Sequence, residues 1–312
     1  MRQKLVFFQL IMLLLLWGIQ ACSAQEMPTP SSGEIIRHAD FPSQFVGKRH
    51  IDVWLPEGYS EDKSWAVLYM HDGQNLFDST VTWNHQEWMV DETISSLIES
   101  GQIRPVIVVG IFNNGKMRSA EYFPEKAFRT LKKSDLNFIA DHVDPENLEQ
   151  FSNTICSDQY LKFLVQELKP FIDSTYNTKR DRSNTFIAGS SMGGLISMYA
   201  ICEYPGVFAA AGCLSTHWPG FIDFPGNPVP GAFVQYLDEN LPPPETHKMW
   251  FDHGTETLDS TYGQYQERVD PIMRNHGYGA ENWTTRVYPG TNHSERAWQE
   301  RFDEVLLFLL KD

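Results

Sequence analysis

The feature that most constrains the fold is a series of short apolar runs, each of strand length, separated by segments with helical spacing. Runs of this kind are typical of strands that are covered on both faces in a parallel sheet. The apolar runs lie at residues 65–70, 105–111, 185–188, 208–214, 248–252 and 283–288. Two earlier runs, 34–39 and 45–55, alternate apolar with polar residues and predict antiparallel strands at the start of the sheet.

Apolar residues recur at helical spacing between these runs, notably in 88–98, 160–172 and 302–310. Strands that alternate with helices predict an α/β protein, a three-layer α/β/α sandwich around one mostly parallel sheet. Two stretches, 113–157 and 216–227, lack a clear period. We expect them to cross one end of the sheet rather than to form a second domain.

The N-terminus has the pattern of a secretory signal. Arg2 and Lys4 precede a nearly unbroken apolar run, interrupted only by Gln9, that ends near Trp17 and is short for a membrane-spanning helix. Ile19-Gln20-Ala21-Cys22 resembles a bacterial lipobox, although Gln20 is an unusual residue within it. We therefore expect a signal peptide over 1–21 and a lipid anchor on Cys22, which would hold the protein at the cell envelope.

A cut after Ala24 is the alternative, and it would release a soluble periplasmic or secreted protein. Residues 22–34 are rich in Pro and Ser and predict a semi-extended linker, which leaves 35–312 for the folded domain.

Charge and cysteine content exclude two classes of function. The formal net charge is −15, and it becomes −17 once Arg2 and Lys4 are removed with the signal, whereas nucleic-acid binding relies on a basic surface. No Cys-x-x-Cys or Cys/His spacing typical of a structural zinc site occurs in the sequence. Cys202 and Cys213 fall in apolar patterns and are expected to be free buried thiols.

The candidate nucleophile is Ser191, in the G-x-S-x-G string of residues 189–193. A predicted strand precedes this string and a predicted helix follows it, which is the context of a nucleophile elbow. In such a turn the serine hydroxyl stands at the carboxyl end of the sheet, above a helix N-terminus that favours developing negative charge.

A serine nucleophile needs a base, and the base needs an acid that orients it. His293 follows the last predicted strand and is the expected base, ahead of His253 and His217. Asp259 and Glu256 share the loop after the preceding strand, and either could reach the imidazole. We prefer Asp259, whose alternative role is to cap the next helix.

An oxyanion hole requires two N–H donors. The N–H of Met192 follows the nucleophile, and the N–H of Gln74 lies in the His71-Asp72-Gly73-Gln74-Asn75 loop after an early strand. The alternative for this loop is a plain turn, since Asp-Gly is a common turn pair. Together the three loops predict acyl transfer through a covalent intermediate, which calls for neither a metal nor an organic cofactor.

These segments resemble the esterase branch of the α/β-hydrolases, which includes esterase D, feruloyl esterases attached to xylanases, enterochelin esterases and mycolyltransferases. The resemblance covers the chain from about residue 34 to the end and rests on the 67–77 string, the elbow at Ser191 and the 289–298 string. It implies an α/β-hydrolase fold, with Ser191 as nucleophile, His293 as base and the Gln74 and Met192 N–H groups in the oxyanion hole. It also implies a role for Asp72 in substrate contact, and it places the segment 118–124 near the site.

We therefore expect an exported serine carboxylesterase that acts on a small-molecule or polysaccharide-linked ester, such as an acetyl or feruloyl group on carbohydrate. Loop aromatics could stack on such a substrate, or they could belong to the core. The candidate substrate contacts are Asp72, Trp88, His217 and Trp218, with Trp83 as a further aromatic. The alternatives are a siderophore trilactone esterase and a non-catalytic surface binding protein on the same fold.

Overall fold

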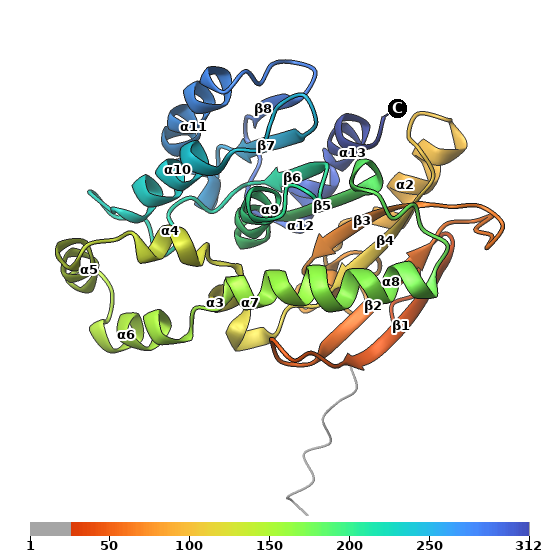
Figure 1. Cartoon of the computed structure of the whole chain (residues 1–312), viewed down its shortest axis with the longest axis horizontal. Coiled ribbons are helices and arrows are strands. Elements are labelled where there is room, and N and C mark those ends of the chain that lie inside the picture. The colour runs from red at the N-terminus through yellow and green to blue at the C-terminus, as the bar shows by residue number, and fades with distance from the viewer. Residues whose placement is uncertain (1–25, 312) are drawn as a thin grey trace, which may run out of the picture.

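The computed structural model describes residues 26–311, so the expected signal peptide and Cys22 lie outside the described residues. One sheet of eight strands runs through the molecule in the order β1-β2-β4-β3-β5-β6-β7-β8, and Figure 1 shows helices on both of its faces. The strands are β1 (Glu34–Phe41), β2 (Arg49–Leu55), β3 (Ala66–His71), β4 (Val106–Ile111), β5 (Thr185–Ser190), β6 (Ala210–Leu214), β7 (Lys248–Gly254) and β8 (Trp283–Tyr288). Each predicted run therefore forms a strand.

The sheet is antiparallel at one edge and parallel elsewhere. Strand β2 pairs antiparallel with both β1 and β4, whereas the remaining neighbours pair in parallel. This arrangement confirms the expected fold class, including the antiparallel strands at the N-terminus.

Two hydrophobic cores explain why the central strands are apolar throughout. In β3, Val67 and Tyr69 belong to one core, whereas Leu68 and Met70 belong to the other. The first core is completed by helices that include α7 (Ser157–Lys162), α9 (Met192–Glu203), α10 (Val229–Asn240) and α11 (Gly263–Asn275). The second is completed by α2 (Val90–Glu99), α12 (Glu295–Gln299) and α13 (Phe302–Leu310). The sheet is thus the middle of three layers.

The stretch 113–157 is more helical than its lack of periodicity indicated. It contains four short helices, α3 (Arg118–Tyr122), α4 (Glu125–Arg129), α5 (Lys133–Ala140) and α6 (Pro145–Thr154), and α5 and α6 lie at the left of Figure 1. The start of α6 is indicated by capping residues rather than by apolar periodicity. Asp144 accepts the N–H of Glu146 at 2.9 Å, and Pro145 occupies the first turn. The other aperiodic stretch, 216–227, contains no helix or strand.

The longest apolar pattern, 160–172, is one helical run with an irregular centre. Helix α7 passes into a π-helical segment (Phe163–Leu168) and then into α8 (Lys169–Thr175). Pro170 lies in the first turn of α8, where it removes a backbone donor from the preceding helix.

Part of the predicted linker is fixed to the domain. Thr29 donates its N–H to Asp78 at 2.8 Å, and Ser31 and Ser32 donate theirs to Asp91 at 2.7 and 3.2 Å. The chain is therefore attached to the folded domain before β1 begins. Within residues 26–311, none of the helices has both the length and the apolar character needed to span a bilayer.

Candidate active site

Ser191 lies in a strained turn between β5 and α9. Its backbone has φ 58° and ψ −122°, a region that a residue with a side chain rarely adopts. The turn is held by its neighbours, since the Ser191 N–H donates to the carbonyl of Leu214 at 2.9 Å. A Cβ on Gly189 would lie 2.9 Å from the carbonyl carbon of Gly193, so the sharp turn requires glycine there.

Asp259 and His293 come from the loops that follow β7 and β8, and their side chains meet. Nδ1 of His293 lies 2.5 Å from Oδ1 of Asp259. The rings of Tyr262 and Trp298 pack perpendicular to the imidazole, with ring centroids 5.8 and 5.0 Å away. The imidazole thus contacts two aromatic rings and has one nitrogen on the carboxylate.

Asp259 is wholly buried and hydrogen-bonded at both oxygens. Its Oδ2 accepts the hydroxyl of Ser215 and the N–H of Gly254, each at 2.6 Å. Burial alone would raise the pKa of this carboxyl, but the bonds from His293, Ser215 and Gly254 lower the pKa below its ordinary value. The carboxylate is therefore charged at neutral pH.

The competing residues lie elsewhere. Glu256 is exposed on the same loop, and no contact joins its carboxylate to His293 within the described part of the chain. His253 is buried, and its Nδ1 lies 2.7 Å from the carbonyl oxygen of Gly254. Of the two candidate acids, the structure brings Asp259 to the imidazole.

The two candidate oxyanion donors follow different strands. Gln74 lies in a 3₁₀ turn (Gly73–Asn75) directly after β3, and Asp72 adopts a left-handed conformation with φ 56° to enter this turn. A Cβ on Gly73 would lie 2.4 Å from the backbone of Gly110, so only glycine permits this close approach. Met192 is the first residue of α9, where N–H groups have no partner within the helix.

Ser191, His293 and Gln74 line one cleft of about 630 Å³. Asp72 also lines it and accepts two 2.7 Å bonds from the guanidinium of Arg118. Burial would raise the pKa of Asp72, but Arg118 and Asn113 hold it below its ordinary value. The side chains of Ser191 and His293 form no hydrogen bond among the described residues, and in unliganded enzymes such bonds are often long.

The predicted aromatic contacts divide between the cleft and the core. Trp88 lines the cleft, although it is only 3% exposed and packs on Trp298 and Phe302. Trp83, by contrast, lines the cleft while 80% exposed. Trp218 is 1% exposed, donates to Gln266 at 3.2 Å and packs on Phe251, so the structure places it in the core rather than in the cleft.

His217 lines a second, more apolar cavity of about 380 Å³. Its Nδ1 lies 2.6 Å from the hydroxyl of Tyr262, and its Nε2 lies 3.0 Å from the carbonyl of Phe221. Met192, the residue that follows Ser191, also lines this cavity. Burial, together with the nearby His293, lowers the pKa of His217 to about 4.

The sequence did not indicate Ser215, which donates to Asp259, or the two residues that donate to Ser215. Arg301 donates to Asp252 at 2.7 Å and to the hydroxyl of Ser215 at 2.9 Å. Trp298 donates its indole N–H to the same hydroxyl at 2.9 Å. One signal was available for Ser215, because it directly follows the strand that lies between β5 and β7 in the sheet.

A family model described as "Putative esterase" matches residues 43–309. An endo-1,4-beta-xylanase/feruloyl esterase of Xylanibacter ruminicola is 28% identical over 218 residues, which cover 66% of this chain and 25% of that protein. The chain spans between 13% and 60% of the length of four curated relatives that it matches.

Solved structures share the fold. A ferulic acid esterase aligns with a TM-score of 0.61 at 18% identity, over 89% of this chain and 98% of that one. An enterochelin esterase from Shigella flexneri aligns with a TM-score of 0.62 at 17% identity, over 91% and 60% of the two chains.

Proposed function

Because this chain belongs to the esterase family whose model spans residues 43–309, we propose that it hydrolyses carboxylic esters with Ser191 as nucleophile, His293 as base and Asp259 as acid. The observation that carries the proposal is the 2.5 Å contact between His293 Nδ1 and Asp259 Oδ1 at the cleft that Ser191 lines. The three residues follow β5, β7 and β8, at the end of the sheet where open α/β folds gather catalytic groups.

The geometry supports a proton path through His293. Its Nδ1 is the donor to Asp259, because the lowered pKa of that carboxyl keeps it an acceptor. The lone pair of Nε2 is then free to take the proton of Ser191 as the serine oxygen attacks the ester carbonyl. Asp259 stabilises the imidazolium that results, and His293 returns the proton to the leaving alcohol. Water then hydrolyses the acyl-enzyme by the same path.

Negative charge develops on the carbonyl oxygen during the attack. The N–H groups of Gln74 and Met192 are the proposed donors to it, and Met192 adds the positive end of the α9 dipole. Loss of one such donor costs about 10²–10³ in kcat in a related type of site.

The cleft supports a carbohydrate-linked substrate. Trp83 offers an exposed ring on which a sugar could stack, and Asp72, Arg118 and Glu295 offer polar contacts. The apolar cavity beside Met192, lined by Leu148, Phe151 and Phe221 among others, is suited to an aromatic acyl group. The printed names of similar proteins include feruloyl esterases, which agrees with a feruloyl group there. An acetyl group would leave this cavity largely empty.

A siderophore trilactone is the second candidate, supported by the similarity to an enterochelin esterase. Arg118 is a cationic group in the cleft that could meet a catecholate, but it is already paired with Asp72, and Glu295 adds a second carboxylate. Because the carboxylates outnumber the guanidinium, the cleft suits a neutral sugar ester better than an anionic siderophore.

We also propose that residues 35–312 form the esterase domain of an exported lipoprotein, after a signal over 1–21 and a short linker. Cys22 would carry the lipid anchor. Mass spectrometry of the mature N-terminus tests this directly, since a lipidated Cys22 is expected and a free Gln25 would contradict it.

A fluorophosphonate probe tests the nucleophile. We expect the probe to label the wild type and Ser190→Ala but not Ser191→Ala. Ser190 is the matched control because it is adjacent in sequence and lines the same cleft. A folded wild type that takes no label would favour a non-catalytic binding protein. Hydrolysis of acetylated and feruloylated oligosaccharides and of a trilactone would then identify the substrate class.

A further inference from the structure

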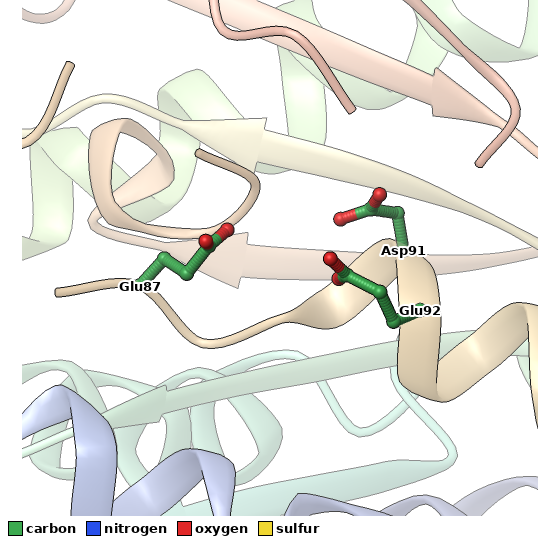
Figure 2. A group of neighbouring side chains, drawn as sticks. All are labelled: Glu87, Asp91 and Glu92. Carbon is green, nitrogen blue, oxygen red and sulfur yellow. The ribbon is translucent and has the colours of Figure 1, made fainter. Parts of the chain in front are cut away.

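Three carboxylates converge outside the cleft, where the loop after β3 enters α2. They belong to Glu87, Asp91 and Glu92, and one oxygen from each lies within 4.8 Å of the others. Figure 2 shows the three carboxylates turned toward one another. Acidic residues in the first turn of a helix are stabilised by the helix dipole, which explains why Asp91 and Glu92 lie there but not why Glu87 joins them.

A second observation points to a ligand. Each of the three carboxylates has one buried oxygen without a hydrogen-bond partner, namely Oε2 of Glu87, Oδ1 of Asp91 and Oε2 of Glu92. Asp91 is 0% exposed, so water does not reach it from the surface. Buried carboxylate oxygens that lack a donor are costly, and a native structure needs a reason for each of them.

The surroundings supply hydrogen-bond donors to two of the carboxylates but no positive charge. Oδ2 of Asp91 accepts the N–H groups of Ser31 and Ser32, and Oε1 of Glu92 accepts the hydroxyl of Ser31 at 2.6 Å. No lysine or arginine of the described residues forms an ion pair with any of the three acids. The three carboxylates therefore repel one another with no cation of the chain to offset their charge.

A shared proton would relieve only part of this repulsion. One proton between Asp91 and Glu92 satisfies two oxygens and leaves Oε2 of Glu87 buried without a donor. A cation, by contrast, would satisfy all three oxygens at once.

We propose that Glu87, Asp91 and Glu92 bind a calcium ion. Calcium takes six to eight oxygen ligands in flexible geometry, and carboxylates are prominent among them. Magnesium usually keeps several waters and binds through only one or two carboxylates. Three convergent carboxylates therefore suit calcium better, and water can fill the remaining positions on the side of Glu87 and Glu92, which are half-buried.

The ion would join the loop before α2 to the first turn of that helix, next to a segment that is distant in sequence. Glu87 lies in the loop between Gln86 and Trp88, both of which line the cleft, whereas Asp91 and Glu92 begin α2. Ser31 and Ser32 reach the same carboxylates from the segment before β1. Bound calcium would therefore fix one wall of the cleft to the body of the domain.

Calorimetry and thermal unfolding of the full-length mature protein test the site. After treatment with EDTA, calcium chloride should give a one-site isotherm with about one ion per chain and should raise Tm by a few degrees, because a ligand that binds only the folded state stabilises it. Magnesium at the same concentration should raise Tm less. Glu87→Gln and Glu92→Gln should each weaken calcium binding at least roughly tenfold, since ligand charge sets affinity at such sites.

Glu99→Gln is the matched control, because Glu99 is an exposed acid at the other end of α2. It should bind calcium as the wild type does. The proposal is overturned if calcium neither gives heat nor shifts Tm of the wild type. It is also overturned if Glu87→Gln and Glu92→Gln bind calcium as tightly as Glu99→Gln. A gain of stability in Glu92→Gln without any response to calcium would mean that a shared proton alone occupies the cluster.

Discussion

The hydroxyl of Ser215 lies 2.6 Å from Oδ2 of Asp259 and donates its hydrogen to that oxygen. Two buried donors, the indole N–H of Trp298 and the guanidinium of Arg301, each approach the Ser215 oxygen at 2.9 Å. Because both lone pairs of the hydroxyl are engaged, its proton is directed at the carboxylate. Ser215 thus positions Asp259 from the end of β6.

We predict that Ser215→Ala lowers kcat about 10-fold to 100-fold, the equivalent of one hydrogen bond to a charged group. The acid limb of the kcat/KM profile should move to higher pH, because Asp259 loses a donor that lowers its pKa. Ser157→Ala is the control, since it removes an equally buried hydroxyl that accepts the Glu125 N–H. It should lower stability and leave the pH profile unchanged. Identical profiles for wild type and Ser215→Ala would contradict the positioning role.

The choice of acid can be tested with two isosteric changes on one loop. Asp259→Asn should lower kcat by about 10⁴, the size of the effect when a triad carboxylate becomes an amide. Glu256→Gln should change kcat little, because its side chain is exposed and does not contact His293. Steady-state kinetics on one soluble ester measure both, and the opposite ranking would show that Glu256 is the acid.

Stability should fall as the pH falls below about 6.5. In the folded protein burial lowers the pKa of His217 to about 4, whereas the unfolded chain takes up this proton near 6.5. Between these values the unfolded state binds the extra proton, so unfolding becomes easier by at most about 1.4 kcal/mol per pH unit. His71, with its pKa lowered to about 3, acts in the same direction.

His217→Gln should flatten this dependence while it keeps a polar side chain for Tyr262 and Phe221. Urea unfolding between about pH 7 and pH 5 measures the slope for each protein. An unchanged slope in the variant would show that His217 is not a source of the dependence.

Gly189→Ala should destabilise the protein by about 2 kcal/mol, the usual cost of overpacking, because the new Cβ would lie 2.9 Å from Gly193 backbone. Gly206→Ala is the control, since no atom lies within 4 Å of the Cβ it would add. Chemical denaturation of both variants gives the comparison. Equal stability of the two would mean that the elbow can relax around a side chain.

Trp83→Ala should raise KM for oligosaccharide-linked esters several-fold and leave hydrolysis of a small aryl acetate unchanged. The ring is 80% exposed at the cleft, so its loss removes a stacking surface without opening the core. Kinetics on the two substrates with one enzyme preparation separate the effects. Equal losses on both substrates would show that Trp83 does not act through sugar contact.

The sheet could be predicted because burial on both faces leaves a local trace. Val67 to Met70 are apolar in sequence since each side of β3 faces a core. Ser191 and His293 could be identified as candidate site residues for a related reason, because each follows such a run. The four short helices between 118 and 154 could not be found by period, since elements of five to ten residues show too few turns for one to appear.

The sequence could not show which loop side chains point into the protein and which point into the cleft or solvent. Asp259 is buried beside His293 and Glu256 is exposed, although only Thr257, with φ 53°, and Leu258 lie between them. Trp218 and Trp83 both lie in loops, yet one fills the core and the other faces the cleft. Such outcomes depend on long-range packing, which a local pattern does not encode.

The left-handed backbone at Asp72 and at Ser191 affects which substitutions would stabilise this protein. Each residue stores strain of order 1–3 kcal/mol that glycine would release. A search for thermal tolerance alone would therefore replace both with glycine, and it would remove the hydroxyl of the proposed nucleophile and the carboxylate partner of Arg118. The protein is therefore less stable to unfolding than its sheet alone would make it. The lost stability lies in the two loops on which the proposed catalysis depends.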